Sequence, residues 1–235
     1  MASSATMPAA YAARLRSSPG DPLLTFYDLA SGERVELSAT TWINWAAKVA
    51  GLLTDELDLE RGSRMRVDLG THWQASVLAG GAWWAGIAVV APDAADAAQV
   101  DLVVCAESDV QQHLALGVPV LASSLKPMAG PCGPLPAGAL DFSREVLAMP
   151  DAYVPLDAPE ADDVAWLGAI GGELAQAALL AHPDDDRVLS DAPPVSAEGV
   201  ALLGSVLAGS GSIVLVNRHG REVPASLPEQ ERVSR

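Results

Sequence analysis

The chain has 235 residues, half of them hydrophobic and only 5% aromatic, so it can bury a sizeable core in one large α/β domain or two small ones. Acidic residues outnumber basic ones by 30 to 14, which gives a net charge of −16. A surface this acidic repels phosphate backbones and anionic lipids, so we expect neither nucleic acid nor a membrane as a partner.

Neither the cysteines nor the N-terminus indicates export. Cys105 and Cys132 are too few for a disulfide framework, and Cys105, within the apolar run 101–105, is expected to be a small core side chain. The first 16 residues lack a basic segment followed by an apolar one, so no secretory signal is expected. These features predict a cytoplasmic protein.

A β-hairpin and a long helix are the first predicted elements. Residues 23–28 and 33–37 are β-prone and are joined by a turn-type sequence at 29–32. Ser38 is a good N-cap for a helix behind it. The apolar stripe of that helix is expected to be core; it consists of Trp42, Trp45, Val49, Leu52 and Leu53.

The uncharged stretch from Trp73 to Pro92 is long enough to span a bilayer. It contains three glycines, however, and is not flanked by the basic residues of a membrane anchor. We therefore divide this region into a helix at 72–84, a turn at 85–86 and a buried strand at 87–90.

Helices and strands alternate after a strand predicted at 65–69. Further helices are predicted at 94–99, 107–115, 141–148, 172–181 and 196–208, and further strands at 101–105, 118–123, 163–167, 187–190 and 212–216. Apolar strands separated by helices are typical of a parallel sheet covered on both faces. The predicted fold class is thus α/β, a mainly parallel sheet covered by helices, with a small N-terminal β-hairpin.

Two proline-containing stretches suggest how the chain is organised. Four prolines and three glycines lie between Ser123 and Gly138, and an acidic proline-containing linker follows at 150–163. The predicted organisation is a flexible N-terminus at 1–20, a first α/β subdomain at 21–125, a connection at 126–161, a second α/β portion at 162–217 and a polar, loosely ordered tail at 218–235.

A glycine-rich turn is the most suggestive local feature. Gly168, Gly171 and Gly172 follow a predicted strand and open a predicted helix, and helix N-termini bind anions. A phosphate loop also needs a lysine and a serine or threonine, and neither occurs between residues 162 and 182. Glu173, expected in the first helical turn, would repel a phosphate. We interpret the segment as a strand-to-helix turn and keep the three glycines as weak cofactor-binding candidates, in a degenerate phosphate-loop position.

The other polar clusters give no catalytic or metal-binding residue. His182 and the run 184–186 suggest a solvated loop, because three consecutive carboxylates do not point the same way. His72 at the start of a helix is expected to cap it or to lie on the surface, and His113 and His219 carry no further signal. Ser190 lacks the glycines of a hydrolase elbow. No catalytic residue, metal or cofactor is predicted.

Taken together, these segments resemble the opening of the adenylate-forming superfamily, the AMP-dependent synthetases and ligases. The resemblance is carried by "LLTFYDLASGERVELS", "RGSRMRVDL", "WWAG" and "IAVVAPD", and later by "RVLSDAPPVSAEGVALLGSVLAGSGSIVLV". Their order and spacing cover about two-thirds of the chain. Within the superfamily the chain resembles short, uncharacterised actinobacterial proteins that correspond only to the N-terminal portion.

The departures from the family shape the functional expectation. The family's phosphate loop is rich in serine, threonine and glycine and ends in Pro-Lys-Gly, whereas "WLGAIGGELAQA" stands here. The resemblance also places the adenine motif and the catalytic lysine of the C-terminal domain beyond residue 216. The expected function is a catalytically inactive relative that acts as an interaction or small-molecule-binding module. The alternatives are an acyl or nucleotide binder and one half of a split adenylating enzyme. A protein partner or a homodimer is also expected.

Overall fold

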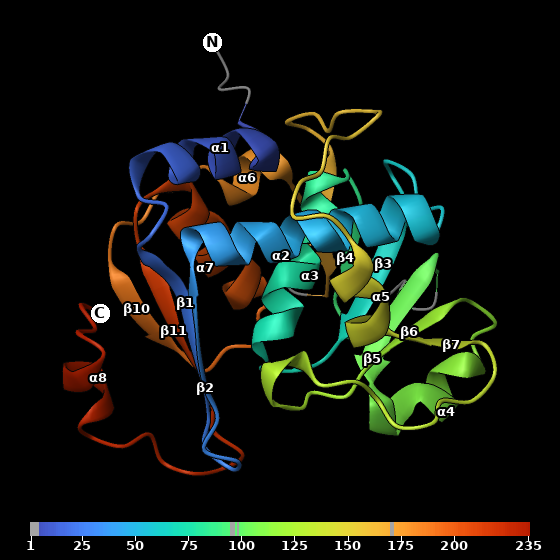
Figure 1. Cartoon of the computed structure of the whole chain (residues 1–235). Coiled ribbons are helices and arrows are strands. Elements are labelled where there is room, and N and C mark those ends of the chain that lie inside the picture. Colours follow the sequence, from blue (N-terminus) through green and yellow to red (C-terminus); the bar gives the residue numbers. More distant parts are fainter. Residues whose placement is uncertain (1–4, 95–96, 98, 170–171) are drawn as a thin grey trace.

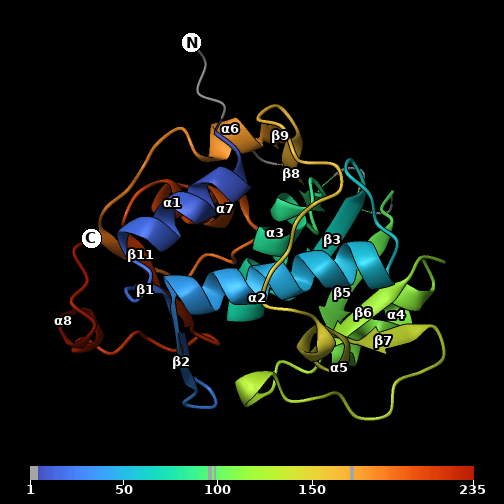
Figure 2. The ribbon, with the colours of Figure 1, turned by 45° about the horizontal axis from the view of Figure 1, so that its top comes forward.

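Two sheets with helices between them make up the chain (Figure 1). The structure is a computed structural model that describes residues 5–94, 97, 99–169 and 172–235. Sheet A has the strand order β10-β11-β1-β2, and sheet B has the order β7-β6-β5-β3-β4-β8-β9. The long helix α2 (Ala39–Gly51) crosses the front of the molecule from one sheet to the other (Figures 1 and 2).

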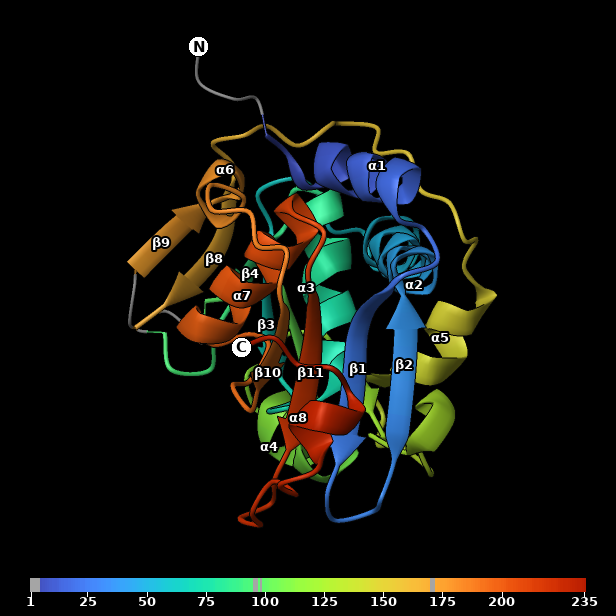
Figure 3. The same ribbon diagram turned by 90° about the vertical axis from the view of Figure 1, so that its left-hand side faces the viewer.

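Sheet A joins the first strands of the chain to the last. Its members are β1 (Pro22–Asp28), β2 (Arg34–Ser38), β10 (Arg187–Ser190) and β11 (Ser212–Asn217). The β1–β2 pair is the predicted antiparallel hairpin, and β1 runs parallel to β11. Figure 3 shows this sheet face on, with α7 (Ala197–Ala208) and α2 behind it and the short helix α8 (Leu227–Gln230) in front.

Sheet B is parallel except for its last strand. Its members are β3 (Arg64–Asp68), β4 (Ala88–Val90), β5 (Leu102–Ala106), β6 (Val120–Ser123), β7 (Ala139–Asp141), β8 (Val164–Gly168) and β9 (Gly172–Ala175). Strand β9 is antiparallel to β8. The remaining helices are α1 (Met7–Ser17), α3 (Trp73–Trp84), α4 (Val110–Leu114), α5 (Phe142–Ala148) and α6 (Gln176–Leu179), with a π-helical turn at Leu52–Glu56 and 3₁₀ turns at Glu107–Asp109 and Pro127–Ala129.

Close packing of α2 on α3 forms the centre of the core. A Cβ on Gly81 would lie 2.4 Å from the Val49 side chain, so only glycine allows the two helices to approach this closely. The Trp42 indole donates a hydrogen bond of 3.0 Å to Ser76 of α3. As predicted, Ser38 caps α2, its hydroxyl accepting from the Thr41 amide at 3.2 Å.

Most predicted elements are confirmed. The stretch 73–92 folds as helix α3, a turn and strand β4, and in the described ranges no helix is long and apolar enough to cross a membrane. The predicted α/β fold with its mainly parallel sheet and N-terminal hairpin is present, although the strands divide into two sheets. The helix predicted for 94–99 falls largely on residues 95, 96 and 98, outside the described part.

The structure differs from the prediction in four segments, one of which is strand β7, where no strand was predicted. The helix predicted for 172–181 is wrong at its start, because residues 172–175 form β9 and only Gln176–Leu179 are helical. Residues 1–20 had no predicted element, yet α1 lies there, with Met7 and Tyr11 buried against α3 and α7. The tail predicted to be loosely ordered packs on sheet A instead, with Leu227 buried. Contacts distant in sequence stabilise helix α1 and the C-terminal tail, whereas β9 forms because it pairs with the preceding strand β8.

Candidate functional site

A pocket of about 710 Å³ opens between the two sheets. It lies at the carboxyl ends of β3, β4, β8 and β10 and beside the start of α7. Its walls are formed by three segments of chain and two single residues: 67–70, 91–93, 191–193 with 195–198, Ala75 and Trp166. In open α/β sheets ligands bind in the crevice outside the carboxyl ends of the strands. We call this cavity the inter-sheet pocket.

Trp166 of β8 fixes one wall of the inter-sheet pocket. Its ring is fully buried, and its indole nitrogen donates a hydrogen bond of 2.9 Å to the Val195 carbonyl. That bond ties β8 of sheet B to the segment that precedes α7. The Ser196 hydroxyl then accepts from the Gly199 amide at 3.1 Å and caps α7. The wall is therefore held by the helix cap of Ser196 and by the long-range hydrogen bond from Trp166 to Val195.

The polar groups of this pocket are acidic. Among the described residues that line it there is no lysine, arginine or histidine, while four carboxylates contribute to the lining: Asp68, Asp93, Asp191 and Glu198. Two of these carboxylates are paired with arginines outside the lining: Arg66 donates to Asp68 at 3.0 Å and Arg218 donates to Asp191 at 3.0 Å. The pocket thus presents apolar walls and net negative charge.

The four carboxylates were not predicted to lie together. Asp68 ends β3, Asp93 follows β4, and Asp191 follows β10. Their positions at or just after strand ends were a usable signal in the sequence, because the carboxyl ends of parallel strands lie at one edge of a sheet. What the sequence does not show is that β10 belongs to a second sheet and faces β3 and β4 across a cavity.

The three candidate glycines lie on or beside the β8–β9 hairpin. Gly171 is outside the described residues. A Cβ on Gly168 would lie 2.2 Å from the ring of Trp166, and Gly172 has φ +67°, so packing and backbone geometry explain two of the glycines. The strand-to-helix turn predicted here is wrong, because Glu173 lies on a strand and not in a first helical turn. A role of the three glycines in cofactor binding stays a prediction.

His72 caps α3, one of the two roles expected for it, but it is buried. Its Nδ1 accepts from the Gln74 amide at 3.3 Å, and its ring packs edge-on to Phe26 at a centroid distance of 4.9 Å. The residue is 3% exposed. Burial lowers the pKa of His72 to about 4, against the opposing effect of the Asp28 charge. His72 is therefore a neutral structural group and does not line the inter-sheet pocket.

The remaining polar candidates are structural too. Asp185 accepts hydrogen bonds of 2.8 Å from both the amide and the hydroxyl of Ser210, and Asp184 pairs with Arg235. No group of three potential metal ligands occurs in the parts of the chain that the structure describes. Cys105 and Cys132 are both buried, as expected for Cys105, and burial raises their pKa values to about 12 and about 11. Neither thiol is activated as a nucleophile.

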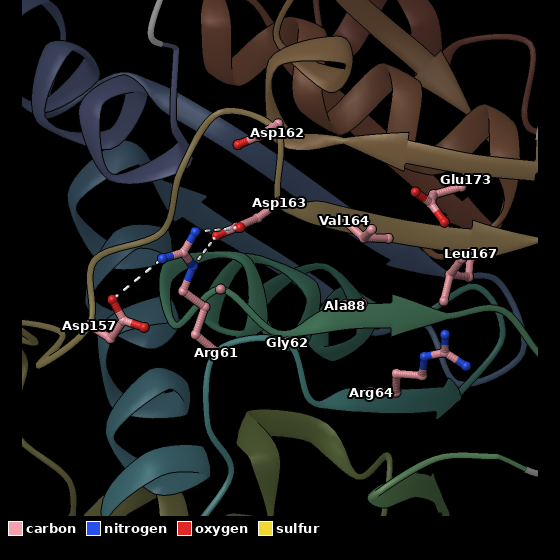
Figure 4. A pocket seen from close by; sticks show the side chains of 11 residues that line it. Arg61, Gly62, Arg64, Ala88, Asp157, Asp162, Asp163, Val164, Leu167 and Glu173 are labelled. Atoms are coloured by element: carbon pink, nitrogen blue, oxygen red, sulfur yellow. Dashed lines mark hydrogen bonds and ion pairs between the residues drawn. The ribbon is translucent and has the colours of Figure 1, made fainter.

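Another hollow, of about 480 Å³, lies on sheet B near the amino ends of β3, β4 and β8 (Figure 4). Arg61 points towards Asp163 and donates two hydrogen bonds of 2.7 Å to its carboxylate. Burial raises the pKa of Asp163, but the hydrogen bond from Arg61 outweighs it, so the net pKa is below its ordinary value. Arg61 is thereby neutralised, which leaves this hollow without a strong anion site at that residue.

The fold is that of the N-terminal part of acyl-CoA synthetases. An acyl-CoA synthetase of Brucella canis matches with a TM-score of 0.76 and 18% identity, covering 98% of this chain and 46% of that one. A mutant form of the coronafacic acid ligase from Pectobacterium brasiliense matches with a TM-score of 0.74, 10% identity and coverage of 98% and 49%. MatB from Rhodopseudomonas palustris matches with a TM-score of 0.69 and 18% identity, covering 98% of this chain and 48% of that one. The chain spans about half the length of these structures.

In sequence, the chain is similar to a "TIGR03089 family protein" of Mycobacterium tuberculosis. The two are 41% identical over 143 residues, which make up 60% of this chain and 59% of the relative. The chains are therefore of similar length, and the similarity covers less than two thirds of either. No protein-family model matches the chain.

Proposed function

We propose that this chain is a small-molecule-binding module that uses the fold of an acyl-CoA synthetase N-terminal part without adenylating chemistry. Its ligand occupies the inter-sheet pocket and combines an apolar body with a neutral or cationic polar group. The single observation that carries the proposal is the pocket itself: about 710 Å³ at the carboxyl ends of four strands, lined by carboxylates and by no described cation.

The charge of the pocket decides between ligand classes. A phosphate or carboxylate placed beside Asp93 and Glu198 would meet like charges, which weakens binding. A neutral or protonated amine meets no such penalty, and the apolar wall formed by Ala75, Trp166 and Val195 supplies burial. The acidic lining thus disfavours adenylates and CoA as ligands of the pocket and favours amphipathic amines.

The β8–β9 hairpin supports the absence of adenylating chemistry. Phosphoryl and adenylyl transfer depend on positioning and on neutralising charge. Between residues 162 and 182 the chain has no lysine, serine or threonine, and Glu173 adds a negative charge. We therefore expect no pyrophosphate release from ATP with any carboxylic acid.

A matched pair of ligands tests the charge preference directly. Hexylamine and hexanoate have the same chain length and differ in charge, so a thermal-shift titration with each isolates the polar group. We expect hexylamine to raise the melting temperature and hexanoate to have no effect. At 100 times its dissociation constant a ligand adds about 2.7 kcal/mol, or roughly 5–10 °C for a chain of this size.

Two tryptophan substitutions on one helix supply the control. Ala197→Trp fills the inter-sheet pocket, whereas Ala201→Trp, one turn later on α7, faces a different groove. The amine shift should disappear in the first variant and persist in the second. Equal shifts with hexylamine and hexanoate would overturn the charge argument, and ATP-dependent pyrophosphate release would overturn the proposed function itself.

A further inference from the structure

The four carboxylates that line the inter-sheet pocket are not equivalent. Asp68 and Asp191 are each paired with an arginine, at 3.0 Å in both cases, so the protein itself balances their charges. Asp93 and Glu198 are exposed, and no lysine, arginine or histidine in the described ranges lies within ion-pair distance of either. These two carboxylates are therefore open to a positively charged group of a ligand.

The two unpaired carboxylates belong to different parts of the lining. Asp93 lies three residues beyond the end of β4, in sheet B. Glu198 is in the first turn of α7, and α7 packs on β11 of sheet A. One carboxylate thus comes from the end of sheet B, and the other comes from the helix that packs on sheet A.

The uncharged part of the lining is largely apolar. Ala75, Trp166 and Val195 contribute to it, and the Trp166 indole is held there by its hydrogen bond to the Val195 carbonyl. Methylene groups gain free energy when they leave water for such a surface. An alkyl ligand with a charge at one end only would leave either Asp93 or Glu198 without a partner.

We infer that the inter-sheet pocket binds linear aliphatic diamines, with one ammonium group beside Asp93 and the other beside Glu198. The inference rests on the proposed function and narrows its ligand class from amines to dications. An ammonium group only donates hydrogen bonds and an ionised carboxylate only accepts them, so each end of a diamine matches one carboxylate. The alkyl chain lies against the apolar lining.

The volume of the pocket indicates the length of the diamine. A compact cavity of about 710 Å³ is about 9 Å across, and ordinary bond lengths place the two nitrogen atoms of an extended six-carbon diamine about 9 Å apart. Diaminohexane is therefore the reference ligand, in a series that runs from about four to about ten carbons.

Each diamine is compared with the amino alcohol of the same length, in which a neutral hydroxyl replaces one ammonium group. Isothermal titration calorimetry at low ionic strength measures both dissociation constants. An ion pair with an exposed carboxylate contributes modestly, so we expect the diamine to bind roughly threefold to fivefold more tightly at the best length. Added salt should reduce this preference, because it screens exposed charges.

Removing either carboxylate tests the two ends separately. In Asp93→Asn and in Glu198→Gln the preference for the diamine should fall below about twofold, because only one of its ends then meets a charge. The amino alcohol should lose at most about half of its affinity, since it can still bind the remaining carboxylate. Glu222→Gln, at an exposed site outside the pocket, removes one negative charge as well and should keep the full preference.

A filled pocket controls for binding of dications elsewhere on this acidic chain. In Ala197→Trp the added ring occupies the pocket, so the preference for the diamine should disappear. Circular dichroism confirms that each variant is folded.

Failure of this inference is distinguishable from failure of the proposed function. The diamine assignment alone is overturned if hexylamine binds but no diamine exceeds its amino alcohol by about twofold. It is also overturned if the preference persists in either carboxylate variant or in Ala197→Trp. If hexylamine does not bind at all, the proposed function is overturned and this inference with it.

Discussion

At the scale of single residues, the packing around Gly168 explains why this position is a glycine without any role in binding. Its neighbour two positions earlier, Trp166, lays its ring where a Cβ would be, at 2.2 Å. The same ring forms a wall of the inter-sheet pocket. The indole of Trp166 therefore requires a glycine at position 168, whether or not an anion binds at this degenerate phosphate-loop position.

Gly168→Ala should therefore lower the free energy of unfolding by about 1–3 kcal/mol, because the ring of Trp166 must shift to admit the methyl group. Chemical denaturation measures the change. Gly20→Ala is the matched control, since nothing lies within 4 Å of its added Cβ. Unchanged stability in Gly168→Ala together with lost ligand binding would instead favour a binding role for this glycine.

His72 gives the fold a pH dependence of defined sign. Burial holds the folded-state pKa of His72 at about 4, below the roughly 6.5 of an unfolded histidine, so the unfolded state takes up a proton first. The contribution of this residue is complete above pH 6.5 and is lost as the pH falls towards 4. The loss approaches about 1.4 kcal/mol per pH unit, about 3 kcal/mol in total.

His72→Asn keeps an acceptor at the N-cap and removes the titrating group, so it should flatten the stability profile between pH 6.5 and 4. Urea unfolding at several pH values measures this slope. His182→Asn, at an exposed histidine, should leave the slope as it is in the wild type. An unchanged slope in His72→Asn would contradict a neutral buried imidazole.

At the scale of elements, the side chain of Glu231 binds the C-terminal segment to sheet A, together with the buried Leu227 and the backbone hydrogen bonds of residues 234 and 235. Glu231, with its side chain 9% exposed, accepts hydrogen bonds from Tyr27, from Arg34 at 3.0 Å and from Arg187 at 2.6 Å. The carboxylate of Glu231 thus accepts hydrogen bonds from side chains of three strands, β1, β2 and β10. Beyond it, the Ser234 amide donates to the Arg187 carbonyl at 2.8 Å.

Glu231→Gln should loosen this segment and lower the free energy of unfolding by about 1–3 kcal/mol, because charged donors lose their ionised acceptor. Hydrogen exchange of the Leu189 amide, which donates to the Arg235 carbonyl at 3.1 Å, should accelerate. Glu229→Gln, exposed on the same short helix, should change neither quantity. Equal protection of Leu189 in both variants would contradict the role given to Glu231.

The elements that the sequence predicts well are those that local chemistry determines. Ser38 caps α2, and the apolar helix and strand in 73–92 lie on either side of the turn predicted at 85–86. The segment 172–175 was misassigned because Ala-rich "GELAQAAL" has helical propensity, whereas pairing with β8 makes its first part a strand. Helix α1 was missed because its stability comes from distant partners, such as the Gly209 and Gly211 carbonyls that accept from Arg14.

At the scale of the whole molecule, the division of the strands into two sheets could not be predicted from the sequence. Alternating helices and strands indicate a parallel sheet, but no local pattern shows that β1 pairs with β11, about 190 residues later. The inter-sheet pocket depends on that pairing, so only the strand-end position of its carboxylates could have been anticipated. The resemblance to adenylate-forming enzymes pointed to the right fold, because the order of whole segments carries more information than any single motif.

The segment that follows Glu231 also affects how the molecule behaves in a crowded solution. A bare strand edge is a template on which the strand of another molecule can add, the first step towards a fibril. In sheet A the outer side of β10 is occupied by residues 234 and 235 of the same chain, and the other edge, β2, carries the charges of Arg34 and Glu36. Stacking of molecules edge to edge is therefore blocked at β10 by backbone pairing and discouraged at β2 by charge.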